Sequence, residues 1–234
     1  MGAPAHIHKI IYVRYGVNAW FHGISPKNIL HKGIETCPRD WELKLLHEVA
    51  ESLEQGRPLP ATTIDRIADA QTSLRQSVAA AVKNAGSYDY NQRDYATAER
   101  LYASSLKILP NAVGTIVYYA NTLLDQGRLD DALTAYRRMY AIGPPSVLPS
   151  VIPGLQTLLG ARPDKWEARM LLAHAYIVSD NLDGARQTIE TGPETERQKL
   201  TLFGKVFEEL ERVYRERGDL RNADGIRDLM AGSE

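Results

Sequence analysis

The chain has 234 residues, of which 44% are hydrophobic and 24% charged, and its formal net charge is −1. This composition is ordinary for a globular protein and provides no overall attraction to nucleic acid or to an anionic membrane. The single cysteine, Cys37, excludes an internal disulfide framework.

Residues 1–38 differ from the rest of the chain and are expected to form a basic N-terminal arm without helix. Residues 1–34 contain no acidic residue and four basic ones, Lys9, Arg14, Lys27 and Lys32. Residues 10–15 are rich in β-branched and aromatic side chains, which favours a strand, a short hairpin or an extended segment. A lone hairpin is marginal in water, so the arm needs a surface to dock on. That surface could belong to its own helices, to a second copy of the chain or to a partner.

Residues 39–78 are expected to form N-terminal helices. From Asp40 onward the apolar side chains Trp41, Leu45, Leu46, Val49 and Leu53 fall on one helical face, and Gly56 ends this run. Thr62 or Thr63 then caps a second, long helix whose apolar face continues to Val82.

A repeat of 34 residues follows. The spacing is the same between Ala98 and Ala132, between Tyr102 and Tyr136, and between Pro110 and Pro144. A fixed period of this length is typical of stacked helix pairs. In such pairs the alanines let two helix backbones approach, the tyrosines fill the space beside them, and the prolines end the second helices.

This pattern resembles the tetratricopeptide repeat (TPR) family, whose signature is W-x2-L-G-x2-Y, then A-x3-F, then P. The best copy has Ile116, Tyr119 and Leu123 in its first helix and Ala132 and Tyr136 in its second. The resemblance implies an all-α protein, an α-solenoid of antiparallel TPR-like helix pairs over residues 79–234. Its register slips after Pro144, which predicts an inserted helix near residues 147–160, and Pro153 would either start that helix or kink it.

Chemical motifs are absent from the sequence. No phosphate-binding glycine loop, dinucleotide fingerprint, zinc-protease motif or nucleophile elbow occurs. His6, His8, His22, His31 and Cys37 gather near the N-terminus, but their spacing fits no zinc pattern. We therefore expect no enzyme activity, no cofactor and no metal, and we assign these histidines to the surface or to docking.

The expected partner is a protein or peptide. The basic arm carries interleaved aromatic side chains, a pattern that also occurs in proteins that bind single-stranded nucleic acid, but four charges support that alternative weakly. No apolar run is long enough to span a bilayer, and no secretion signal is visible. The expected location is cytoplasmic, with a removed export signal left open.

In the TPR-like superhelix that the resemblance implies, the first helix of each pair lines a concave groove. Mapped onto this chain, the groove residues are Lys83, Ser87, Tyr90, Val117, Tyr118, Asn121, Leu124, Met170, His174 and Ile177. Lys83 matches the carboxylate clamp of some TPR proteins, whereas Ser87 and Tyr118 replace its asparagines. The groove therefore suits an apolar segment, with Tyr118 and Met170 as anchors. The alternative is that some of these side chains pack inside the chain.

The sequence thus predicts a non-catalytic scaffold, such as an adaptor, assembly factor or complex subunit, that binds a partner segment in the groove. An alternative is an accessory or regulatory subunit of an enzyme system whose N-terminal histidines contact a metal or substrate. Self-association, with the N-terminal arm of one copy in the groove of another, is a further possibility.

Overall fold

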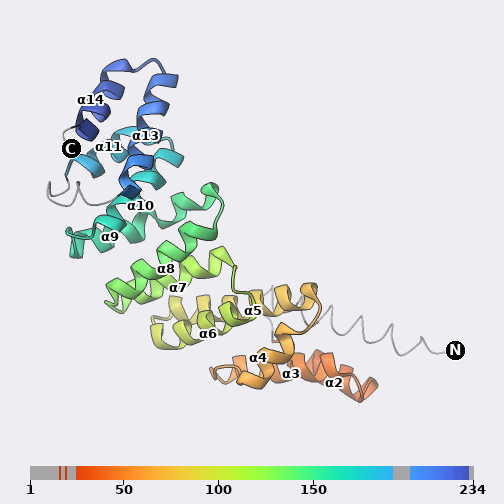
Figure 1. Cartoon of the computed structure of the whole chain (residues 1–234). Coiled ribbons are helices and arrows are strands. Elements are labelled where there is room, and N and C mark those ends of the chain that lie inside the picture. Colours follow the sequence, from red (N-terminus) through yellow and green to blue (C-terminus); the bar gives the residue numbers. More distant parts are fainter. Residues whose placement is uncertain (1–15, 17–18, 20–24, 192–200, 232–234) are drawn as a thin grey trace. The chain divides into compact units, whose positions relative to one another are not determined.

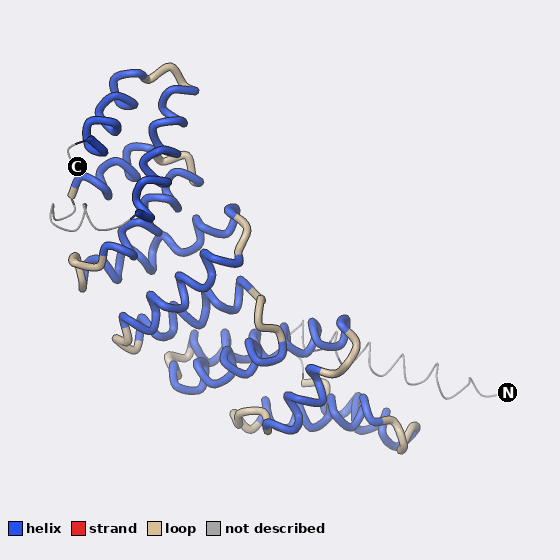
Figure 2. Tube along the Cα trace, viewed as in Figure 1, coloured by secondary structure: helices blue, strands red, loops and turns tan. Residues whose placement is uncertain are grey.

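The computed structural model describes residues 16, 19, 25–191 and 201–231. Within these residues every regular element is a helix (Figure 2). This confirms the all-α class and the helical-repeat interpretation. The chain divides into two compact units, residues 1–126 and 127–234, which are described in turn. The strand or hairpin expected at residues 10–15, and its proposed arm exchange, lie outside the described residues.

The first unit contains six labelled helices (Figure 1): α2 (Lys27–Thr36), α3 (Trp41–Glu54), α4 (Ala61–Ala68), α5 (Thr72–Asn91), α6 (Tyr95–Ile108) and α7 (Val113–Asp125). Helix α6 packs between α5 and α7 and also contacts α4. One apolar core joins α2 to α6 and includes the fully buried Leu30, Leu43, Leu46 and Ile67. No described helix is long and apolar enough to cross a membrane.

Helix α2 corrects the expectation that residues 1–38 are free of helix. Leu30, fully buried, and Ile34 lie one helical turn apart and pack into the core of the first unit. The ammonium group of Lys27 lies 3.7 Å from the Glu51 carboxylate and 3.6 Å from that of Glu54, both on α3. Sequence reasoning gave weight to the β-branched run upstream and missed this amphipathic turn.

The prediction of one long helix from residue 62 to residue 82 is also wrong, because the helix is interrupted between α4 and α5. The guanidinium of Arg75 donates a hydrogen bond of 3.2 Å to the carbonyl of Ala68, which is among the last carbonyls of α4. At the start of α4, Thr63 is fully buried and hydrogen-bonds Glu48 of α3 at 2.5 Å. Arg75 thus connects α5 to the end of α4, and Thr63 connects α4 to α3, although no proline or glycine lies between α4 and α5.

The second unit contains α8 (Leu129–Ile142), the 3-10 helix η1 (Pro145–Val151), α9 (Ile152–Ala161), α10 (Trp166–Val178), α11 (Leu182–Glu190), α13 (Thr201–Glu216) and α14 (Leu220–Ala231). Helix α10 packs on α9, α11 and α13, and α13 pairs with α14. The residues expected to form one inserted helix form η1 and α9. Pro153 lies in the first turn of α9, so it starts this helix rather than kinking it.

Connections between paired helices contain a residue in the left-handed conformation. Gly127 and Gly218 have φ of 76° and 74°, which any glycine tolerates, whereas Arg93 and Asp180 both have φ of 64°. Residues 93 and 127 are one repeat length apart. The same turn therefore recurs, with glycine in some copies and a side chain in others.

Candidate functional site

An exposed aromatic surface of the first unit lies where α5 and α7 meet. Tyr118 of α7 stacks on Tyr102 of α6, with ring centroids 5.8 Å apart and planes 18° from parallel. Tyr118 is 43% exposed, whereas Tyr102 is fully buried. The ammonium group of Lys83, on α5, lies 5.4 Å from the centre of the Tyr118 ring, within cation–π distance. We call Lys83, Ser87 and Tyr118 the α5–α7 face.

Ser87 connects this face to the buried ring beneath it. The hydroxyl groups of Tyr102 and Ser87 are hydrogen-bonded at 3.1 Å, and the Ser87 hydroxyl also donates to the carbonyl of Lys83 at 3.1 Å. Burial raises the pKa of Tyr102 to about 12. The Tyr102 phenol thus stays protonated in the neutral pH range. Tyr118 is therefore stacked on a ring that is fully buried and whose hydroxyl is hydrogen-bonded to Ser87.

Tyr90 lies further along α5 and joins it to the end of α7. Its hydroxyl donates a hydrogen bond to the carboxylate of Asp125, and its ring lies 5.4 Å from that of Tyr95. Burial, followed by this hydrogen bond, raises the pKa of Tyr90. The side-chain amide of Gln126 donates to the carbonyl of Tyr95 at 3.0 Å. Tyr90, predicted as a groove residue, therefore clamps the two helices that carry the α5–α7 face.

Three further predicted groove residues lie on α7. Asn121 and Leu124 are half-buried, whereas Val117 is only 8% exposed and belongs to the packed side of the helix. The structure therefore assigns Val117 to packing, which is the alternative that the sequence left open.

The predicted residues of the second unit are largely interior. Met170 and Ile177 are each 7% exposed and pack in one apolar cluster with Trp166, Phe207 and Leu210. Met170 was expected to anchor a partner, and its position in this core corrects that expectation. The sequence could not separate the two roles, because an apolar side chain on a first helix suits a groove and a core equally well.

His174 makes its contacts within the second unit. Its Nε2 atom is 2.9 Å from the carboxylate of Glu209, and its ring meets the Tyr140 ring edge-on at 5.3 Å. The side chain is only 16% exposed. His174 therefore connects α10 to α8 and α13 and offers little surface to a partner.

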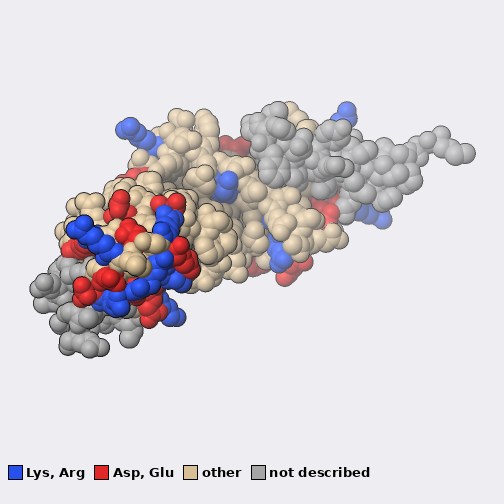
Figure 3. Space-filling view, turned by 90° about the horizontal axis from the view of Figure 1, so that it is seen from above, with Lys and Arg blue, Asp and Glu red and all other residues tan. Residues whose placement is uncertain are grey.

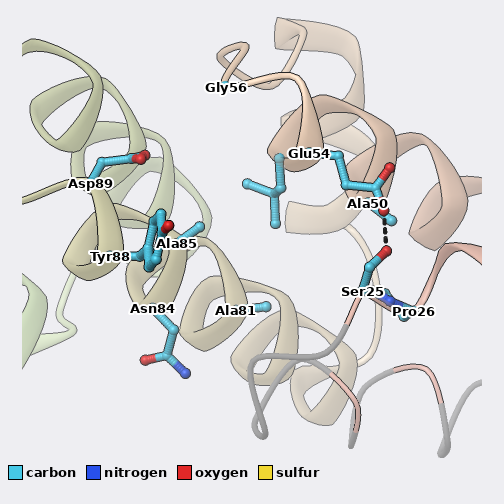
Figure 4. Close-up of a pocket in the computed structure, with 11 residues that line it drawn as sticks. Ser25, Pro26, Ala50, Glu54, Gly56, Ala81, Asn84, Ala85, Tyr88 and Asp89 are labelled. Atoms are coloured by element: carbon cyan, nitrogen blue, oxygen red, sulfur yellow. Dashed lines mark hydrogen bonds between the residues drawn. The ribbon is translucent and has the colours of Figure 1, made fainter. Parts of the chain in front are cut away.

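A pocket that sequence reasoning missed lies between α3 and α5 (Figure 4). Its volume is about 480 Å³, and small side chains on both helices, Ala50, Ala81 and Ala85, leave the space open. Tyr88 borders the pocket and is 65% exposed. The alanines come from helices that are far apart in the sequence, so no local motif could reveal the hollow.

The rim of this pocket carries acidic groups. Glu54 accepts a hydrogen bond from the Ser25 hydroxyl, as Figure 4 shows, and pairs with Lys27. Asp89 lies on the α5 side, and burial raises the pKa of its carboxyl group. The pocket thus combines small apolar side chains with two carboxyl groups, one of which is paired with Lys27, and it lies on the side of α5 opposite to Lys83 and Ser87.

Groups that bind metals are dispersed. His6, His8 and His22 lie outside the described residues. His31 pairs with Glu35 at 3.5 Å, and its ring lies 5.9 Å from that of His47. No group of three or more histidine, cysteine or acidic side chains in the described part of the chain has the geometry to hold a metal ion.

Comparison with known proteins gives matches to family models and to solved structures. Two family models described as tetratricopeptide repeat match residues 83–147 and 152–201. A search of the curated proteins gave no match. A solved structure titled "MamA MSR-1 C2" is 16% identical, with 79% of this chain and 96% of that chain covered and a TM-score of 0.31. Another, "MamA RS-1 ArsTM double mutant", is 16% identical, with 83% and 94% covered and a TM-score of 0.29.

Proposed function

Residues 83–147 and 152–201 belong to the tetratricopeptide repeat family, and from this premise we propose that the protein is a non-catalytic scaffold that holds a partner segment on the α5–α7 face. Repeats of this family support a role in protein interaction in general. The choice of this face is our own inference from the side chains that it exposes.

The observation that carries the proposal is that Tyr118 is exposed and yet fixed in position. An aromatic ring that is 43% exposed, stacked on a buried ring and next to a lysine has little freedom left to lose on binding. Exposed aromatic side chains at the centre of an interface often dominate its binding energy. A partner would gain most by covering Tyr118 with an apolar side chain.

Lys83 adds a charge preference to this face. Its ammonium group lies over the Tyr118 ring. A partner carboxylate or carbonyl next to the apolar side chain could therefore accept a hydrogen bond from Lys83. The favoured partner is therefore a protein segment that combines an apolar anchor with a neighbouring acceptor. The pocket between α3 and α5 provides a second place, across α5, for an apolar side chain of the same segment.

A peptide selection tests the proposal. The full chain is panned against a random peptide library, and the enriched peptides are then titrated against the wild type and against Tyr118→Ala by calorimetry. Loss of the Tyr118 ring should weaken their binding by about 1–3 kcal/mol. Retained affinity in Tyr118→Ala would remove the α5–α7 face as the binding surface.

Trp41→Ala is the matched control, because Trp41 is an aromatic side chain of similar exposure, 46%, on α3. It should leave peptide affinity unchanged. Lys83→Met should weaken only those peptides that carry an acidic residue. Circular dichroism of each variant confirms that the helices remain intact.

A further inference from the structure

A second, polar pocket lies in the second unit, where the α10–α11 turn meets the α13–α14 turn. Its volume is about 390 Å³. The lining is dominated by polar side chains from both turns, namely Asp180, Asn181, Asp183, Tyr214, Arg217 and Asp219. It shares no residue with the α5–α7 face.

The carboxylates of this pocket outnumber its cations. Asp180 is paired with Arg217. The carboxylate of Asp219 accepts hydrogen bonds of 3.2 Å and 2.7 Å from the backbone and side-chain nitrogens of Asn222. Asp183 lies in the first turn of α11 and is exposed. With three acidic side chains and one arginine, the lining carries a formal charge of −2.

Several charges on the neighbouring helices are paired with one another. Figure 3 looks onto the α13–α14 end, where acidic and basic side chains intermingle. Arg212 pairs with Glu216, and Arg215 pairs with both Glu211 and Asp224. The excess of negative charge in the pocket lining is therefore not matched by these neighbouring pairs, which involve other residues.

Tyr214 is an independent sign that the pocket receives a polar group. Its side chain is only 3% exposed, and its hydroxyl has no hydrogen-bond partner within the described part of the chain. Tyrosine hydroxyls are normally paired when they are buried, as that of Tyr102 is in the first unit. Tyr214 is one of the residues that line this pocket.

We propose that this pocket binds an arginine side chain of a partner protein, with Asp183 and Asp219 facing the guanidinium and the Tyr214 hydroxyl as a further acceptor. Burial, followed by the charge of Asp183, raises the pKa of Tyr214, so the hydroxyl is neutral at physiological pH. Its oxygen can accept a hydrogen bond from an N–H group of a cation, and it adds no charge to the pocket.

Arginine fits this set of acceptors better than lysine. Its planar guanidinium presents five donors in a fixed fork, whereas the lysine ammonium is a compact point charge. The pocket already accommodates one such group, because the guanidinium of Arg217 contacts Asp180 at its edge. An incoming arginine would use the acceptors that Arg217 leaves.

The test titrates the full chain with N-acetyl-arginine amide and follows binding by NMR chemical shifts. Saturable shifts should centre on the two turns. Asp183→Asn should weaken binding by up to about fivefold, the size of a partly exposed ion pair. Tyr214→Phe should weaken it by about threefold, the value of one hydrogen bond. The phenylalanine variant should fold normally because the hydroxyl has no partner to lose.

Arg217→Ala makes the test stricter, since it removes a competing cation and releases Asp180. It should tighten binding by about twofold to fivefold. Asp228→Asn and Arg221→Ala are matched charge controls on exposed positions of α14 and should have little effect.

Three results would overturn the proposal. The first is the absence of saturable shifts at the two turns, which would show that the pocket does not bind the arginine side chain and is filled by water. The second is equal binding of the neutral analogue N-acetyl-citrulline amide, which would exclude recognition of charge. The third is tighter binding of free L-arginine than of the blocked form, which would identify a small metabolite. None of these results bears on Tyr118, so this proposal and the proposed function fail separately.

Discussion

Gly86 lies directly against the ring of Tyr102. A Cβ atom at this glycine would be 3.0 Å from Cε1 of Tyr102 and 3.3 Å from Cβ of Leu101. The first contact is with a fully buried ring and the second with an atom that is fixed by its own backbone. The close approach of α5 and α6 therefore depends on the absence of a side chain at residue 86.

Gly86→Ala should destabilise the first unit although alanine is the better helix former. Overpacking at a rigid site costs about 1–3 kcal/mol, whereas replacing a helical glycine gains about 1 kcal/mol, so a net loss is expected. Urea unfolding followed by circular dichroism measures the difference. Gly114→Ala on α7, where nothing lies within 4 Å, is the control and should be neutral or mildly stabilising. A gain at Gly86 would show that Tyr102 can move aside.

Alkaline pH should destabilise the chain through Tyr102. Its folded-state pKa is raised to about 12 from the ordinary value of 10. Above pH 10 the unfolded chain loses this proton while the folded chain keeps it, so the free energy of unfolding falls as pH rises from 10 to 12. The full loss from this residue is on the order of 2 kcal/mol.

Tyr102→Phe isolates this effect. The variant should be less stable at neutral pH by about 1 kcal/mol, because the hydrogen bond to Ser87 is lost. Between pH 10 and 12 its stability should decline less steeply than that of the wild type in urea titrations. Parallel decline in the two proteins would show that Tyr102 does not contribute to the alkaline loss.

Arg169 should be the most sensitive charged position of the second unit. It is 8% exposed, and its guanidinium donates to the carbonyl of Thr188 at 3.1 Å, the hydroxyl of Thr191 at 2.8 Å and the carbonyl of Pro163 at 2.9 Å. It also lies over the Trp166 ring at 5.6 Å. One side chain thus connects the start of α10 to the end of α11.

Arg169→Met should lower the free energy of unfolding by about 2–3 kcal/mol, because buried carbonyls lose a charged donor. Arg169→Lys should recover only part of this loss, since an ammonium cannot reproduce the fork. Thermal unfolding measures both variants. Arg137→Met, at an exposed ion pair with Glu167, is the control and should change little. Equal effects at the two positions would contradict the assigned role of Arg169.

The sequence predicted the repeat because its spacing records local packing. Ala98 and Ala132 are fully buried, as close contact between helices requires, and Tyr102 and Tyr136 are buried next to them. Gly56 has positive φ at the turn where its helix was expected to end, and Gly127 and Gly218 have positive φ at later turns. These features depend on residues within one helix pair, so a single sequence can reveal them.

The candidate site was less predictable because it depends on contacts between separate elements. The sequence placed Lys83 and Tyr118 in the same set but could not show that one lies over the other. It could not assign Met170 to the core, since that depends on Phe207 and Leu210, far along the chain. The hollow next to Tyr88 depends equally on Ala50 of a distant helix.

The left-handed backbone conformation of Arg93 marks a position at which the chain can be stabilised by substitution. A residue with a Cβ in this conformation is strained by about 1–2 kcal/mol, and Arg93 is exposed on the surface, so Arg93→Gly should raise the melting temperature. Calorimetric scans of the two proteins measure the gain, and an unchanged melting temperature would mean that the turn carries no strain. The equivalent change at Asp180 would also remove the partner of Arg217. A thermostable form for further biophysical work should therefore begin with residue 93.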